Sequence, residues 1–252
     1  MPIFQTLTDR GFQVEVVSHA EAILLGDFPE AVAELEGVLA AVTIPIDEIV
    51  GSGGGETKGT QRLRRALAAT GWAKGNFLIE KIINGVRRES QSHEVDHIRS
   101  FDRGVIALEI EWNNKDPFFD RDLENFKRLH AEGAISVGVI VTRGTSLQDD
   151  MTAIVRRFGQ ERGLRQASDL ETIGLRPTSR QAGNVARRET GGADFADAWA
   201  RSFVADKYGT ATTHWRKLDD RVRRGVGNPC PLVLIGLPSS IVTFEDSAAQ
   251  AP

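Results

Sequence analysis

The stretch "NFLIEKIINGVRRESQSHEVDHIRSFDRGVIALEIEW" (Asn76–Trp112) decides the fold class. Apolar and polar residues alternate along much of it, and two turn signals divide it, Asn84-Gly85 and Asp102-Arg103-Gly104. An Asn-Gly pair between apolar runs is a strong signal for a β-hairpin. We therefore predict three antiparallel strands, at about residues 77–83, 86–98 and 105–112.

The segments around this stretch add helices and further strands. Apolar residues at helical spacing predict helices over residues 28–42, 60–71, 118–133 and 146–159. Nearly continuous apolar runs predict buried strands over residues 135–144 and 231–238. The pattern is typical of an α/β (α+β) fold, in which helices flank a mixed central β-sheet.

The expected domain is single and spans residues 1–252, with a catalytic sheet at about 76–145. The inner side of the helix at 118–133 is expected to carry Phe118, Leu123, Phe126 and Leu129. Residues 160–200 are polar and weakly patterned, and the tail at 245–252 is expected to be disordered.

Composition excludes several classes of protein. Cys230 is the only cysteine, which excludes an internal disulfide and a cysteine-rich zinc site and suits the reducing cytoplasm. No run of 18 apolar residues is present, so we expect no membrane span, and the N-terminus lacks the layout of a signal peptide. The net charge of −4 argues only weakly against a nucleic-acid partner, because local clusters of Arg and Lys matter more than the sum.

The segment "SHEVDHIR" (Ser92–Arg99) contains His-Glu-x-x-His, the zinc-binding pattern of many metallopeptidases. That chemistry needs His93 and His97 one turn apart on a helix, with Glu94 beside them. Here the surrounding alternation predicts a strand, so we favour ordinary strand residues. A zinc metallopeptidase that uses these three residues stays as an alternative.

On strands, the same region gathers acidic residues. Side chains alternate between the two faces of a sheet, so Val95 and His97 are expected on one face and Asp96 on the other. Glu109 and Glu111 would lie about 7 Å apart on the face of the next strand that is not core. Three carboxylates at one place repel each other unless a cation neutralises them, and hard oxygen ligands suit Mg²⁺. A plain solvent-exposed face of an amphipathic strand is the other interpretation of the two glutamates.

An aspartate on one strand followed by Glu-x-Glu inside an apolar strand resembles the metal site of the PD-(D/E)XK nuclease superfamily. More narrowly, "VDHIRSFDRGVIALEIEWNNKDPFFDRDLENF" (Val95–Phe126) resembles the BglII-like type II restriction endonucleases. A weaker similarity covers "TTHWRKLDDRVRRGVGNPCPLVLIG" (Thr212–Gly236).

The resemblance implies a set of catalytic residues and a cofactor. Asp96 and Glu109 would be ligands of Mg²⁺, for which Mn²⁺ can substitute, and the backbone carbonyl of Ile110 would complete the site. Glu111 occupies the third position of the motif, where related enzymes orient or deprotonate the attacking water. Asp102 is the alternative to Asp96, but it lies in the predicted turn, too far along the chain to reach both glutamates.

The resemblance also implies double-stranded DNA as the partner and a homodimer as the assembly. Candidate residues for DNA contact are basic, hydroxyl or amide side chains in the hairpin and at about 160–230: Arg87, Arg88, Arg180, Gln181, Thr212, Thr213, His214 and Lys217. The sequence thus predicts a sequence-specific, Mg²⁺-dependent endonuclease of the restriction type. A DNA-binding protein that no longer cleaves is the second alternative.

Overall fold

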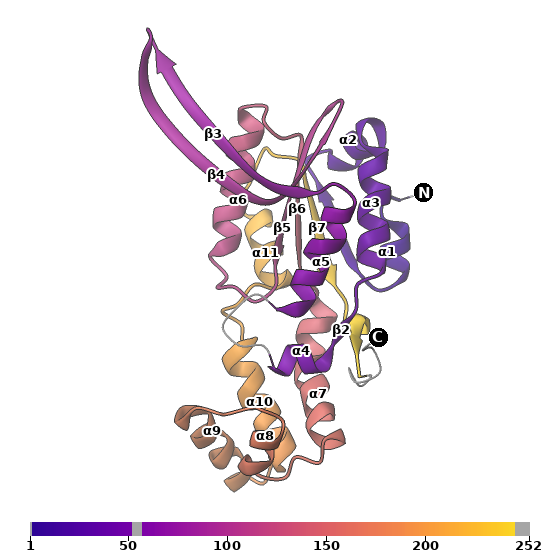
Figure 1. Ribbon diagram of the computed structural model, residues 1–252, viewed down its shortest axis with the longest axis vertical. Helices are drawn as coiled ribbons and strands as arrows, with labels where there is room; N and C mark the ends of the chain where they lie inside the picture. Colours follow the sequence, from indigo (N-terminus) through magenta and orange to yellow (C-terminus); the bar gives the residue numbers. More distant parts are fainter. Residues whose placement is uncertain (1, 52–56, 245–252) are drawn as a thin grey trace.

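The computed structural model describes residues 2–51 and 57–244, so the predicted tail at 245–252 lies outside the described residues. Six strands form the main sheet in the order β1-β7-β6-β5-β4-β3 (Figure 1). Their bounds are β1 (Gln13–Val17), β3 (Ala73–Ile83), β4 (Val86–Phe101), β5 (Gly104–Glu111), β6 (Val137–Arg143) and β7 (Leu232–Leu237). The three central strands β5, β6 and β7 run parallel, and the outer strands pair antiparallel, which gives the predicted mixed sheet.

Helices surround the sheet, and a short parallel pair of strands, β2 (Ile44–Pro45) and β8 (Val242–Thr243), lies apart from it. The helices of the N-terminal half are α1 (Gln5–Asp9), α2 (Ala20–Asp27), α3 (Pro29–Ala40), α4 (Ile46–Gly51) and α5 (Lys58–Ala69). Those of the second half are α6 (Phe118–Ala131), α7 (Thr145–Glu161), α8 (Ala167–Thr172), α9 (Ser179–Thr190), α10 (Phe195–Lys207) and α11 (Trp215–Arg223), followed by the 3₁₀ turn Ser239–Ile241.

Each face of the sheet has its own apolar core. On one face, Ile106, Leu108 and Ile110 of β5 join a large cluster with residues of α1–α5, α7 and α10. On the other face, Ala107 of β5 joins a smaller cluster with residues of α6 and α11. Because both faces are covered, the central strands are apolar on both sides, as their nearly continuous apolar sequences indicate.

Helix α6 packs unusually close to the sheet at Gly138 of β6. A Cβ atom at that position would lie 2.4 Å from the Phe126 ring, so only glycine allows this approach. The inner side of α6 is formed by Phe119, Leu123, Phe126 and Leu129, all fully buried. The expectation of Phe118 on that side is wrong: its ring is exposed and stacks with the guanidinium of Arg121 instead.

The region 160–200, for which the sequence showed little pattern, contains helices α8, α9 and the start of α10 (Figure 1). Val185 is the one buried residue of helix α9, and its other apolar side chains are alanines, so the apolar stripe is weak. Its start is fixed locally, because Thr178 and Gln181 form a capping box.

The predicted three-stranded unit is present, and its first two strands are long. The β3–β4 hairpin projects well beyond the body of the molecule, with the Asn84-Gly85 turn near its tip (Figure 1). Asn84 and Gly85 both have positive φ, as a tight hairpin turn requires. The base of the hairpin lies in the sheet beside β5 and helps to form the site described next.

Candidate active site

Glu109 and Glu111 lie on the face of β5 that is covered by α6. Only 4% and 2% of their surfaces are exposed, so the interpretation as a solvent-exposed strand face is wrong. The sequence analysis predicted the helix α6 but not which face of the sheet it covers, because that depends on tertiary packing. Two acidic groups are therefore held inside the protein, beside Ala107 and the second core.

Asp96 lies on the same face as Glu109, because the regular β4–β5 pairing puts Ile98 opposite Ala107 and Asp96 is two residues before Ile98. An irregularity in β4 adds Val95 to this face. The β3–β4 register shifts between Ala73 and Gly75, so β4 carries one extra residue there. As a consequence, Val95 and Ile98 both pack into the core under α6, which strict alternation would forbid. The backbone N–H of Asp96 donates to Oε1 of Glu109 at 3.4 Å, and the two carboxyl groups also interact.

The prediction that Val95 and His97 share a face is wrong for the same reason. His97 pairs across the strands with Leu108, which belongs to the core on the opposite side of the sheet. Asp102, the alternative to Asp96, lies in the β4–β5 turn between Phe101 and Gly104. The structure thus brings Asp96 and Glu109 together and leaves Asp102 at the far end of β5.

Burial and the repulsion of neighbouring acids raise the pKa values of both glutamates. Burial raises the pKa of Glu109 to about 10, and the charges of Asp122 and Asp96 add to this effect. Burial also raises the pKa of Glu111 to about 8, with a further contribution from Asp122. A bound cation would lower both pKa values again, because it stabilises the ionised form of each carboxyl group.

Asp122 of α6 is a fourth acid in this cluster, and the sequence analysis did not include it among the candidate site residues. It is almost fully buried, lies against Glu111 and forms an ion pair with Arg121 at 2.7 Å. The sequence contains a signal for the burial of Asp122, because residue 122 falls at helical spacing between the buried Phe119 and Phe126.

A pocket of about 570 Å³ opens at Asp96 and Glu109, between the base of the hairpin and α6. Its walls are mainly polar and combine acidic with basic groups: Gln91, Ser92, His93, Glu94, Asp96 and Glu109 from the sheet, and Arg121, Asn125 and Arg128 from α6. Glu111 does not line this pocket. Its carboxylate accepts a hydrogen bond from the Asn114 side chain at 2.7 Å and lies 3.6 Å from the Arg121 guanidinium.

The oxygen ligands at this site are of the type that Mg²⁺ prefers. Mg²⁺ is usually held by one or two carboxylates and keeps several waters, which matches the Asp96–Glu109 pair beside an open pocket. The Ile110 side chain is buried in the opposite core, so only its backbone carbonyl is available. Within residues 2–51 and 57–244, no three Asp, Glu, His or Cys side chains already form a complete cation cage.

The zinc alternative finds no support in this geometry. Residues 92–99 belong to strand β4, not to a helix. His93 faces α6 and contacts Asn125, whereas His97 pairs with Leu108 of the opposite core. The two imidazoles therefore cannot bind one ion as the metallopeptidase motif requires.

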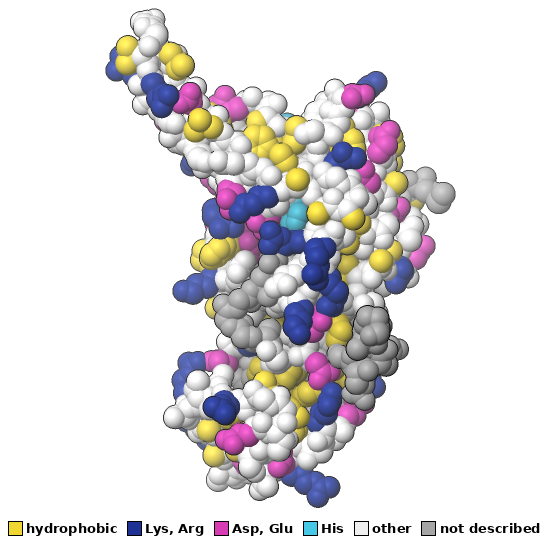
Figure 2. All heavy atoms as spheres, viewed as in Figure 1, with side chains coloured by type: hydrophobic (Ala, Val, Ile, Leu, Met, Phe, Trp, Pro, Cys, Tyr) yellow, Lys and Arg dark blue, Asp and Glu magenta, His cyan; other side chains and the backbone are white. Residues whose placement is uncertain are grey.

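The residues predicted to contact DNA lie in three separate places. Arg87 and Arg88 are exposed in the projecting half of the hairpin, where Arg87 pairs with Glu80 at 2.9 Å. Arg180 and Gln181, at the start of α9, both contact Asp206 of α10. Figure 2 shows Lys and Arg side chains gathered across the middle of one face, between the hairpin and the lobe of α7–α10.

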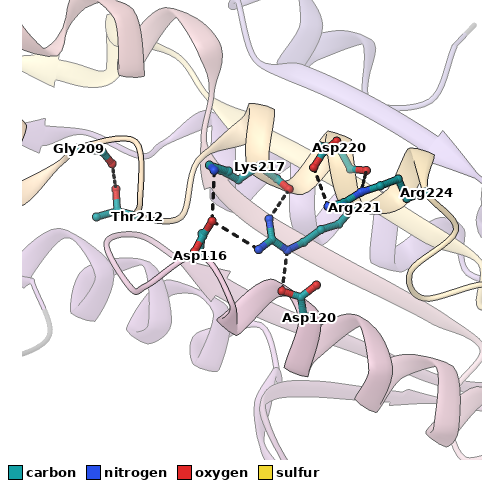
Figure 3. Close-up of polar contacts among 8 residues, drawn as sticks. All are labelled: Asp116, Asp120, Gly209, Thr212, Lys217, Asp220, Arg221 and Arg224. Atoms are coloured by element: carbon teal, nitrogen blue, oxygen red, sulfur yellow. Dashed lines mark hydrogen bonds and ion pairs between the residues drawn. The ribbon is translucent and has the colours of Figure 1, made fainter.

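The third place is the segment before and within α11. Thr213 is fully buried and its hydroxyl accepts from the Asn114 N–H, so it holds this segment to the end of β5. The Thr212 hydroxyl donates to the Gly209 carbonyl at 2.7 Å (Figure 3). His214 is buried as well, whereas Thr212 is only half-buried.

Ion pairs join this segment to the start of α6 (Figure 3). Lys217 lies 3.3 Å from a carboxylate oxygen of Asp116, and the largely buried Arg221 contacts Asp116 and donates to Asp120 at 2.8 Å. Helix α11 is thereby fixed against α6, the helix that covers the carboxylates.

A mixed sheet covered by helices on both faces, with buried carboxylates beside an open pocket, is the architecture of restriction endonucleases. A family model described as restriction endonuclease BglII/BglIII matches residues 12–237, and the chain belongs to this family. Membership confirms the resemblance and makes the protein a hydrolase, a type II site-specific deoxyribonuclease. None of the curated proteins compared with the chain matches its sequence. Among the described residues, no helix has the length and apolar character needed to cross a membrane.

Proposed function

We propose that the protein hydrolyses phosphodiester bonds of double-stranded DNA at a specific sequence, with Mg²⁺ bound by Asp96 and Glu109. The contact between these two carboxyl groups at the pocket floor is the observation that carries the proposal. Mn²⁺ has the same preference for oxygen ligands and would substitute.

Each part of the site has a task in this proposal. Asp96, Glu109 and the Ile110 carbonyl hold the ion, which supplies positive charge that polarises the phosphate and eases deprotonation of water. Glu111, in the third position of the motif, lies behind the pocket wall, where its contact with Arg121 would position that guanidinium beside the attacking water. Arg121 and Arg128 at the pocket wall provide cations for the phosphate oxygens.

Membership of the family supports double-stranded DNA as the partner and a homodimer as the assembly. The Lys and Arg side chains that gather between the hairpin and the lobe of α7–α10 (Figure 2) would neutralise the phosphates of the DNA. The elements at about 160–230 would read the sequence within the same single domain. A homodimer with one site for each strand would cut a palindromic target.

The test is cleavage of mixed-sequence plasmid in Mg²⁺ by the wild type and by Glu109→Gln. Glutamine has the size of the buried glutamic acid, so the variant is expected to fold, but it offers no carboxylate to the ion. The matched control is Glu30→Ala, an exposed acid of α3 on the other side of the sheet. We expect discrete fragments from the wild type and the control, and intact plasmid with Glu109→Gln. Equal cleavage by all three proteins would contradict the proposed metal site.

A further inference from the structure

His93 lies in the same pocket as the proposed metal ligands, three residues before Asp96 on β4. It is 6% exposed and lines the pocket together with Asp96 and Glu109. The sequence analysis treated it as an ordinary strand residue or a zinc ligand. Neither interpretation describes its surroundings.

The imidazole is held from one side only. Its Nδ1 lies 3.0 Å from Oδ1 of Asn125 on α6. Its Nε2 is buried and has no hydrogen-bond partner among the described residues. A buried polar atom without a partner is unfavourable, and at a functional site it indicates a ligand that arrives later.

The Asn125 contact decides which ligand suits Nε2. A side-chain amide oxygen only accepts, so Nδ1 carries the proton and donates it to Asn125. In the neutral ring, Nε2 then carries no proton and offers a lone pair. A lone pair accepts a hydrogen bond from water and does not bind an anionic phosphate oxygen.

Few other proton acceptors of the pocket are free. Glu94 lines it but forms an ion pair with Lys74 at 2.8 Å. Glu111 is engaged by Asn114 and Arg121 and does not line the pocket. Asp96 and Glu109 are occupied with the ion in the proposed function. Arg121 and Arg128 are cations, which attract a phosphate into the pocket beside His93.

We propose that His93 is a catalytic residue and accepts a proton from the attacking water through Nε2; this rests on the proposed function. The water oxygen forms a bond to phosphorus as the bond from phosphorus to the 3′ oxygen breaks. The water proton moves to Nε2, the leaving oxygen takes a proton from solvent, and the imidazolium later returns its proton to solvent. Asn125 keeps the ring in the required tautomer throughout.

The experiment measures single-turnover cleavage in Mg²⁺ and, separately, DNA binding in Ca²⁺ without cleavage. His93→Ala should lower the cleavage rate by about 10²–10⁴-fold, the usual contribution of a general base, and leave DNA affinity within about threefold. Added imidazole should restore part of the rate of His93→Ala, because the vacated space opens into the pocket. It should not restore Glu109→Gln.

Two further variants keep the test decisive. His93→Gln retains the volume and a polar group, so it reports on the reaction if His93→Ala does not fold. His130→Gln is the matched control, because His130 also lies on the α6 side but its Nδ1 contacts the Ile135 carbonyl away from the pocket. The control should cleave like the wild type.

The outcomes separate the two proposals. If Glu109→Gln is inactive while His93→Ala and His93→Gln cleave within threefold of the wild type, the His93 proposal is overturned and the proposed function stands. If His93→Ala loses Mn²⁺ affinity as strongly as Glu109→Gln, His93 is a metal ligand, and its role as proton acceptor is also overturned. If Glu109→Gln cleaves normally, the proposed function itself fails.

Discussion

The backbone N–H of Asp96 donates to the carboxylate of Glu109, two residues that are 13 positions apart and lie on neighbouring strands. The contact follows from the regular β4–β5 pairing, because Ile98 lies opposite Ala107 and Asp96 is two residues before Ile98 on the same face. It joins the two proposed metal ligands before any ion binds. It also distinguishes Asp96 from Asp102, the other acid that the sequence offered.

The first prediction separates these two aspartates. Asp96→Asn should abolish cleavage in Mg²⁺, because it removes one of two carboxylates at the pocket floor. Asp102→Asn should cleave like the wild type, because residue 102 is an exposed turn position beyond the far end of β5. Plasmid cleavage measures both. Loss of activity in Asp102→Asn alone would reverse the assignment.

The second prediction concerns the close packing of α6. Gly138→Ala places a methyl group 2.4 Å from the Phe126 ring, and should lower the free energy of unfolding by about 1–3 kcal/mol through overpacking. Gly183→Ala is the matched control, because nothing lies within 4 Å of a Cβ there and the residue is inside helix α9. The control should gain about 0.5–1 kcal/mol. Urea unfolding monitors both variants, and an unchanged midpoint for Gly138→Ala would contradict this packing.

The third prediction concerns Arg143, a fully buried guanidinium at the end of β6. It donates to the carbonyls of Trp112 and Thr213, and also bonds the side chains of Gln148 and Thr212. Burial lowers its pKa to about 10.

Arg143→Met should lower the free energy of unfolding by about 3–5 kcal/mol, because several buried acceptors lose their donor. Arg165→Met, at an exposed position before α8, should change the stability by less than about 0.5 kcal/mol. Chemical unfolding compares the two. Similar midpoints would show that Arg143 does not hold the segment before α11 to the sheet.

The fourth prediction is a loss of stability in acid caused by His214. Burial lowers the pKa of this imidazole to about 4, and the cations Arg143, Lys217 and Arg216 contribute. The unfolded chain binds a proton below about pH 6.5, but the folded protein resists protonation down to about pH 4. The stabilisation is therefore complete above pH 6.5 and is lost as the pH falls toward 4.

We expect this loss to be about 2 kcal/mol, and His214→Gln should remove it from the pH profile of stability. Unfolding measured at half-unit steps from pH 7.5 to 4.5 gives the comparison. A wild-type profile parallel to that of the variant would disprove the buried neutral imidazole.

The fifth prediction addresses the hairpin. The double variant Arg87→Ala, Arg88→Ala should weaken DNA binding to a similar degree for all sequences, because phosphates are the expected partners of these exposed guanidiniums. The slope of log affinity against log salt should fall by roughly two units of charge. Arg10→Ala, on the C-terminal side of α1, should leave the slope unchanged. An unchanged slope in the double variant would remove the hairpin from the DNA interface.

The sequence by itself determined strands β3 to β7 of the main sheet and helices α3, α5, α6 and α7, because their signals are local, but it did not predict β1. The Asn84-Gly85 turn, the alternation in β4 and β5 and the apolar runs of β6 and β7 each act over a few residues. The motif around Asp96, Glu109 and Glu111 also identified the family.

Only the tertiary structure decided how those residues are used. Whether Glu109 is exposed depends on α6, which covers it by packing against Gly138 of β6. Whether Val95 shares a face with Asp96 depends on a register shift relative to β3, a pairing that the alternation of β4 alone cannot reveal. The pairing of His93 with Asn125, and of Glu111 with Asp122, joins a strand to a helix. Such contacts depend on how elements pack together, and packing is set by the whole chain and not by neighbouring residues.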